Sequence, residues 1–141
     1  MDDEKMLNLI AKNAQMGVVG IDAVKDYASS DALKQELKDQ RVEYNKIYQS
    51  AYSMLKEQGC EVEKVNPMAR ISTEMMSRMK TLGSDADSKI AEMMVQGNAM
   101  GVAKVIKNDH DYSGNSAEVQ ELSKKLLKTQ EQNIENIKSF L

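Results

Sequence analysis

Few residues in this chain could carry catalysis or bind a metal through a thiolate. The 141 residues include one histidine, His110, and one cysteine, Cys60. A serine-histidine-acid site needs a histidine and a nucleophile on a sharp glycine-rich turn, and no such turn lies near His110. A single thiol can form neither an intramolecular disulfide nor a thiolate metal cluster. We therefore expect a non-catalytic protein, with an enzyme or a metal-storage protein as the alternative.

Residues 109–115 have the oxygen-donor spacing of the first half of an EF-hand calcium loop, with Gly114 at the sixth position. The twelfth position is Gln120, whose neutral amide cannot supply the bidentate carboxylate that calcium needs there. The segment is better explained as a helix end at Gly114, followed by Asn115 as the cap of the next helix.

The composition predicts that helices position all of these residues. There is one proline, aromatic residues make up 4%, and good helix formers are abundant. Turn-forming residues at 29–31, 59–60, 83–85 and 113–116 divide the chain. We predict one all-α domain over residues 1–141, with four long helices and a shorter one between the second and third. The predicted helices cover residues 4–28, 31–58, 67–82, 86–112 and 117–141.

Apolar residues in the long segments recur at alternating steps of three and four, as in Leu7, Ile10 and Ala14. This repeat keeps one stripe of each helix facing its neighbours, which is typical of a helical bundle. Short turns make the first two long helices one antiparallel pair and the last two another. The connection over residues 59–84 is long enough for either an up-down or a crossover topology.

Polar residues interrupt these stripes near the middle of each long helix. We predict that they meet at one height as a polar layer, and that its amides pair with one another in the dry interior. The predicted members are Gln15, Gln40, Glu43, Tyr44, Gln96, Asn98, Gln130 and Asn133. We expect the layer to fix helix register, as buried asparagines do in coiled coils. The alternative is a residual iron or manganese site that uses Glu43, with Glu92 if the third long helix is rotated.

Methionines gather on the predicted short helix, at Met68, Met75, Met76 and Met79. Methionine side chains are flexible and polarizable, so they suit adaptable binding surfaces. We expect a partner protein or a second copy of the chain to bind this surface. Burial of the same side chains in the core is the alternative.

The charge distribution argues against several classes of partner. There are 19 basic and 22 acidic residues, spread along the chain, for a formal net charge of −3. This balance gives no reason to expect binding to nucleic acid or to a membrane surface. No apolar run is long enough to span a membrane, and the first residues are acidic where a signal peptide would be basic. We therefore expect a cytoplasmic protein.

Residues 33–44, with the sequence LKQELKDQRVEY, and residues 51–59 resemble the second-helix region of bacterial ferritin-like proteins. That superfamily includes spore coat protein F and several uncharacterised bacterial families. The resemblance implies a ferritin-like four-helix bundle. In its catalytic members, two iron or manganese ions are held by one Glu from each of two helices and a Glu-x-x-His motif from each of the other two.

The resemblance also implies that these dinuclear-site ligands are missing from this chain. The two Glu-x-x-His positions fall on Gln40 to Glu43 and on Gln130 to Asn133. The single-glutamate positions fall where the chain has Gln15, Gly17, Gln96 and Asn98. The implied function is non-catalytic protein association in a structural, coat-like or stress-related role, without a cofactor. The alternative is a divergent ferritin-like protein that still binds iron or manganese.

Overall fold

The structure is a computed structural model that describes residues 1–63 and 73–141, with side-chain surroundings described from residue 77 in the second range. These ranges are helical and contain no strand, so the all-α prediction is confirmed. The helices are α1 (Asp3–Val24), α2 (Asp31–Glu57), α3 (Thr73–Lys80), α4 (Ala86–Asp111) and α5 (Ala117–Ile137). Two short 3₁₀ helices, η1 (Lys25–Tyr27) and η3 (Lys138–Phe140), follow α1 and α5.

Side-chain caps explain most of the helix boundaries. Ser30 accepts a hydrogen bond from the Leu33 amide at 3.1 Å, and Ser116 accepts one from the Val119 amide at 3.3 Å. Gly59 ends α2 with a φ of 71°, which only glycine adopts easily. The predicted first and last helices were too long, since each ends in a 3₁₀ turn. In the predicted helix at 67–82, residues 67–72 lie outside the described part of the chain.

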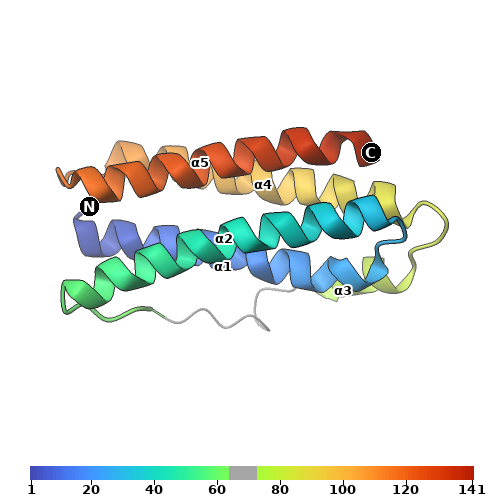
Figure 1. Ribbon diagram of the computed structural model, residues 1–141, viewed down its shortest axis with the longest axis horizontal. Coiled ribbons are helices and arrows are strands. Elements are labelled where there is room, and N and C mark those ends of the chain that lie inside the picture. Colours follow the sequence, from blue (N-terminus) through green and yellow to red (C-terminus); the bar gives the residue numbers. More distant parts are fainter. Residues whose placement is uncertain (64–72) are drawn as a thin grey trace.

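The four long helices lie side by side (Figure 1). The Met1 amino group donates to the Asp111 carbonyl at 3.0 Å, so the start of α1 meets the end of α4. The end of α2 is at the same end of the molecule, because the Glu63 amide donates to Asn8 of α1 at 2.9 Å. At the other end, the Ser29 amide donates to Asp87 in the first turn of α4 at 2.7 Å.

These contacts decide the topology that the sequence left open. Helices α2 and α4 run in the same direction, so the end of α2 and the start of α4 lie at opposite ends of the bundle, separated by the length of α2, about 40 Å at 1.5 Å per residue. Each long helix packs most closely against two neighbours, in the cyclic order α1, α2, α5, α4, and α1 also contacts α5 across the core. Every neighbouring pair is antiparallel (Figure 1). The chain therefore consists of two helical hairpins, α1–α2 and α4–α5, that pack against each other.

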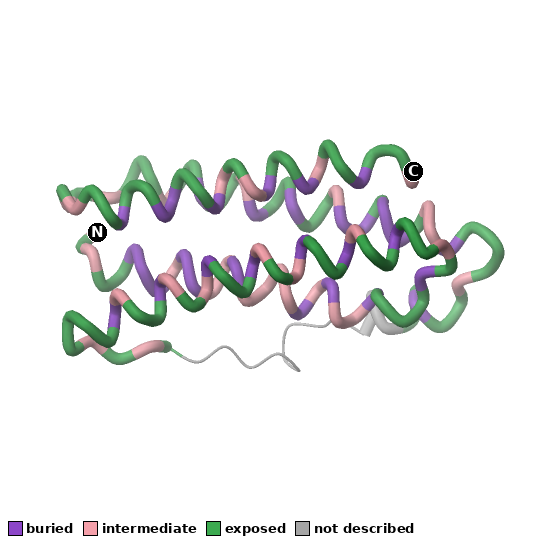
Figure 2. The backbone as a smooth tube through the Cα atoms, in the orientation of Figure 1, coloured by how far each residue is buried: buried purple, intermediate pink, exposed green. Residues whose placement is uncertain are grey.

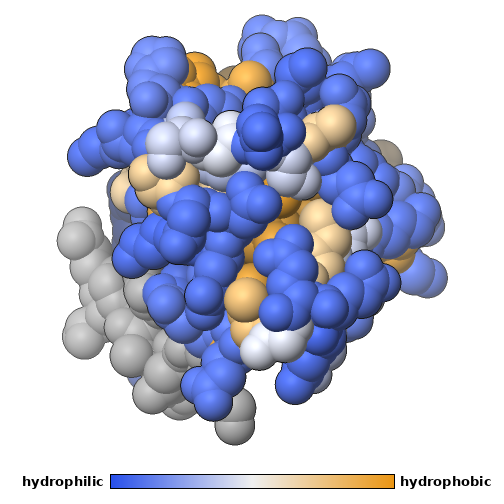
Figure 3. Space-filling view, turned by 90° about the vertical axis from the view of Figure 1, so that its left-hand side faces the viewer, coloured by the Kyte–Doolittle hydropathy of each residue, from blue (hydrophilic) through white to orange (hydrophobic). Residues whose placement is uncertain are grey.

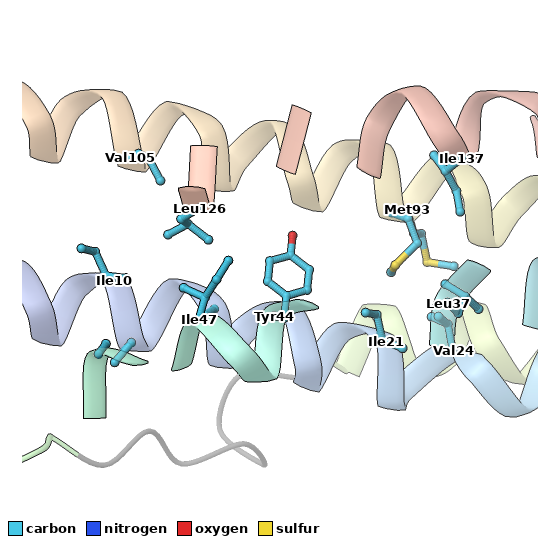
Figure 4. Packing of buried hydrophobic residues seen from close by; sticks show 14 of the residues in the cluster. Ile10, Ile21, Val24, Leu37, Tyr44, Ile47, Met93, Val105, Leu126 and Ile137 are labelled. Atoms are coloured by element: carbon cyan, nitrogen blue, oxygen red, sulfur yellow. The ribbon is translucent and has the colours of Figure 1, made fainter. Parts of the chain in front are cut away.

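The apolar stripes predicted from the sequence face one another in the core. Figure 2 shows the buried residues on the inner sides of the four long helices and the exposed residues outside. Leu7, Ile10 and Ala14 are all buried, as the heptad spacing predicts. Tyr44 lies near the middle of this core, with apolar side chains on both sides of it along the helices (Figure 4).

No helix in the described part of the chain combines the length and the apolar character needed to cross a membrane.

Candidate functional site

Polar side chains cross the middle of the core and come from all four long helices. Five of the eight predicted members are buried, each with 1% to 5% of its surface exposed. These are Gln40 and Tyr44 from α2, Asn98 from α4, and Gln130 and Asn133 from α5. Half-buried Asn13 of α1, which the sequence reasoning missed, completes the set. These six residues are the polar layer.

Tyr44 and Asn98 join α2 to α4 at the centre of the polar layer. The Tyr44 hydroxyl points away from α2 towards the opposite hairpin (Figure 4), where it donates a hydrogen bond to Asn98 Oδ1. The Asn98 amide group donates to the Met94 carbonyl at 2.7 Å, which fixes the orientation of its oxygen. Asn133 Nδ2 donates to the same Asn98 oxygen at 3.4 Å.

Burial keeps the Tyr44 hydroxyl in its neutral form. Desolvation raises the pKa of Tyr44 to about 12, although the nearby Asn133 and Gln130 side chains favour the phenolate and limit the rise. The phenol therefore acts as a hydrogen-bond donor at neutral pH, and it is neither a base nor an anionic ligand there.

A second set of hydrogen bonds joins α1 to the α4–α5 hairpin. Gln130 Nε2 donates to Asn13 Oδ1 at 2.8 Å, and Asn13 Nδ2 donates to the Gly101 carbonyl at 3.2 Å. Gln40 Nε2 donates to the Asn133 backbone carbonyl at 3.4 Å and so joins α2 to α5. Together with the Tyr44–Asn98 bond, four hydrogen bonds of the polar layer connect one hairpin to the other.

Two glycines make room for the largest side chains of the polar layer. A Cβ atom on Gly17 would lie 2.5 to 2.6 Å from three ring atoms of Tyr44. A Cβ atom on Gly101 would overlap the Gln130 amide and lie 3.1 Å from Asn13 Oδ1. The first glycine faces its partner within the α1–α2 hairpin and the second within the α4–α5 hairpin, so each of these two close approaches lies inside one hairpin.

The polar layer is not fully satisfied. Within the described part of the chain, the buried oxygens Gln40 Oε1 and Gln130 Oε1 have no hydrogen-bond partner. An unpaired buried polar group costs about 1 to 3 kcal/mol. These two oxygens therefore reduce the net stability that the hydrogen bonds of the layer contribute.

Three predicted members of the layer lie elsewhere. Gln96 is exposed, Gln15 is half-buried without a hydrogen bond to the layer in the described part of the chain, and Glu43 faces Lys46, with which it forms an ion pair at 3.3 Å. Because successive helical residues differ by about 100°, a residue close in sequence to a buried position can still point to the side. Asn13 was missed because it lies beside the apolar stripe of α1 in the sequence, although its side chain turns towards the layer. The signal for it was Gly101 on the facing helix, which has no side chain to keep the Asn13 amide away from its backbone carbonyl.

The residues of the alternative metal site are not brought into the layer. Glu92 is exposed on the outside of α4 and borders a small surface pocket with Arg78 and Lys89. Among the described residues, no group of three or more histidine, cysteine, aspartate or glutamate side chains gathers at one place.

The structure corrects the predicted partner-binding surface of methionines at one position. Met79 is buried, because its side chain packs into the core cluster, and so it is not available to a partner. Met68 lies outside the described residues, and the side-chain surroundings of Met75 and Met76 are also outside them.

An open groove of about 820 Å³ lies between the end of α2 and the start of α5. Met54 and Leu122 contribute apolar surface, and Glu57, Glu118 and Lys125 are among its polar residues. This groove contains none of the predicted site residues. Figure 3 views this end of the molecule, where apolar surface shows between largely hydrophilic side chains.

Comparison with known proteins relates the chain to others through its fold. No protein-family model matches the chain, and no curated protein matches it. It is similar to the crystal structure of a DUF305 fragment from Deinococcus radiodurans, with a TM-score of 0.77 and 14% sequence identity. The similarity covers 97% of this chain and 93% of that one. At this identity the likeness concerns the fold, so the chain shares an all-helical architecture with that protein over almost its whole length.

Proposed function

We propose that this chain is a ferritin-like four-helix bundle that acts through association with protein, in a structural, coat-like or stress-related role. In this proposal the polar layer sets the alignment of the two hairpins at the height where catalytic ferritin-like proteins hold their metal ions. The bundle is then a rigid scaffold that presents its outer surfaces.

One observation carries the proposal: the polar layer consists of neutral groups that bond to one another. Asn98 Oδ1 already accepts two hydrogen bonds, from Tyr44 and from Asn133. Iron and manganese in such sites prefer carboxylate and imidazole ligands, and metal ligands must be deprotonated. The raised pKa of Tyr44, about 12, opposes its use as an anionic ligand.

A second candidate function is weak binding of iron or manganese by a divergent ferritin-like bundle. It is favoured by the two buried oxygens without partners in the described part of the chain, Gln40 Oε1 and Gln130 Oε1, because amide oxygens can bind hard cations. Glu43 on α2, which directly precedes Tyr44, would be the carboxylate that joins them.

Thermal unfolding with added Fe(II) or Mn(II) separates the two functions. A ligand that binds only the folded state at 100 times its Kd adds about 2.7 kcal/mol to the free energy of unfolding. For a chain of this size that corresponds to a rise in Tm of roughly 8 °C. We expect no rise beyond that given by the same concentration of Mg(II), and no stoichiometric metal by elemental analysis.

The Glu43→Gln variant is the matched control. A metal-dependent rise in Tm that this variant abolishes would contradict the scaffold proposal and support the second candidate. We expect Fe(II) and Mn(II) to change the Tm of the wild type and of the variant by the same amount, and by no more than Mg(II) does.

A further inference from the structure

The outer face of α4 differs from the exposed sides of α2 and α5. Between Glu92 and Lys107, its exposed residues are nearly all small or apolar, with Lys104 as the one charge. They are Gln96, Gly97, Ala99, Met100, Ala103, Lys104 and Ile106. Met100 is 64% exposed and Ile106 is 42% exposed. By contrast, the exposed side of α5 is mostly Glu, Gln and Lys.

The spacing places these residues on one side of the helix. Glu92, Gln96, Met100, Ala103 and Lys107 follow one another at steps of three or four, so they form a continuous strip along α4. A small residue beside an exposed methionine leaves a shallow surface on which another helix can pack closely. We name this strip, with Ala99, the α4 strip.

The charges at the two ends of the α4 strip are opposite in sign and equally distant from its centre. Glu92 and Lys107 lie about 22 Å apart along the helix axis, and both are exposed. Their midpoint falls between Ala99 and Met100. Neither residue takes part in an ion pair within the described part of the chain.

This symmetry fits a second copy of the same strip. If two α4 helices pack antiparallel about a two-fold axis at Ala99–Met100, Glu92 of each copy faces Lys107 of the other. Gln96 then faces Ala103, and each Met100 side chain lies beside Ala99 of the other copy. A two-fold interface uses the same patch on both subunits and must be self-complementary, which the α4 strip is in charge and in size.

We propose that the α4 strip is a self-association surface, through which two copies of this chain form an antiparallel α4–α4 pair. The inference rests on the proposed function, since it names the partner in that protein association as a second copy. Because the contact is one helix face, the dimer is in concentration-dependent exchange with the monomer.

Sedimentation velocity over a concentration series tests the proposal. The apparent mass of the wild-type chain rises from 15.8 kDa towards twice that value as concentration increases. Met100→Lys places a charge at the two-fold axis, opposite the same charge of the other copy, and abolishes the rise. Val42→Lys is the matched control, because Val42 is an exposed apolar residue of α2, 46% exposed, that lies outside the strip.

A charge exchange tests the antiparallel register. Glu92→Lys and Lys107→Glu each bring like charges together at both ends of the pair and weaken the homodimer roughly tenfold or more. The double variant restores opposite charges and with them dimerisation. A mixture of the two single variants forms a heterodimer for the same reason. Circular dichroism checks that each variant remains helical.

Two results would overturn the inference. One is a wild-type chain that stays at the mass of a monomer over the whole concentration range. The other is a dimer that Met100→Lys and the single charge variants leave intact, which would place the contact elsewhere. Neither result touches the scaffold proposal, which stands or falls on the metal-dependent Tm.

Discussion

The close approach of Gly17 to Tyr44 yields the most demanding prediction, because the same substitution should have opposite effects at two positions in one helix. In Gly17→Ala, the new Cβ atom would lie 2.5 to 2.6 Å from the Tyr44 ring, so the ring must move. Overpacking of this kind costs about 1 to 3 kcal/mol. Loss of the Tyr44–Asn98 hydrogen bond adds about 1 kcal/mol, and the better helix propensity of alanine returns about 1 kcal/mol. We expect a net loss of about 1 to 3 kcal/mol.

Gly20→Ala is the matched control in the same helix. A Cβ atom there would meet its nearest described neighbour, Met94 Cε, at 4.0 Å, which is an ordinary contact. We therefore expect this variant to be more stable than the wild type by about 0.5 to 1 kcal/mol. Urea unfolding followed by circular dichroism measures both differences.

A third variant shows whether the Tyr44 ring is the cause. In a Tyr44→Leu background, Gly17→Ala should lose most of its cost, because the ring atoms that it would meet are gone. A Gly17→Ala protein as stable as Gly20→Ala would refute the close packing of Gly17 against the Tyr44 ring. So would a cost that is unchanged in the Tyr44→Leu background.

Three further predictions concern the polar layer and the end of the bundle. Folding raises the pKa of Tyr44 to about 12, so the contribution of its neutral hydroxyl to the free energy of unfolding is complete below about pH 10 and is lost as the pH rises towards 12. In unfolding experiments at high pH, Tyr44→Phe should therefore lose up to about 2 to 3 kcal/mol less of its free energy of unfolding than the wild type. Gln40→Leu removes an unpaired buried oxygen and a long 3.4 Å hydrogen bond, so its free energy of unfolding should be within about 1 kcal/mol of the wild type or higher. Asp87 accepts hydrogen bonds from the Ser29 and Ser30 amides, which lower its pKa; Asp87→Ala should cost about 1 kcal/mol at neutral pH. That difference should narrow as the pH falls below about 4, because the wild-type contribution is lost when Asp87 becomes protonated. A difference that stays constant from neutral pH to about pH 2 would contradict this cause.

The helices were predictable because their signals are local. The serine caps at Ser30 and Ser116 and the glycine stop at Gly59 lie within one turn of the boundaries that they set. The 3₁₀ endings of α1 and α5 carry no comparable signal, so both helices were predicted too long. The topology depends on contacts between residues far apart in sequence, such as Met1 with Asp111. Apolar spacing within each helix does not encode those contacts.

The sequence predicted the position of the polar layer along the bundle better than it predicted which residues form the layer. Gln40, Gln130 and Asn133 lie on the apolar stripes, and spacing alone places them in the core. Asn13 and Gln15 flank the stripe of α1, and their sequence positions do not show which of them turns inward. The choice is made by the facing helix, where Gly101 leaves its carbonyl open to Asn13.

The close glycine contacts lie within each hairpin, whereas the hydrogen bonds of the amide side chains lie between the hairpins. This arrangement has a consequence for the order of folding. The Gly17–Tyr44 and Gly101–Gln130 contacts can form while each hairpin folds from neighbouring segments of the chain. The Tyr44–Asn98 and Gln130–Asn13 bonds can form only when the finished hairpins meet. Substitutions at Asn98 or Asn13 should therefore accelerate unfolding and leave the refolding rate nearly unchanged. A hairpin docked one helical turn out of place would strand these amides, so such misassembled intermediates should be short-lived.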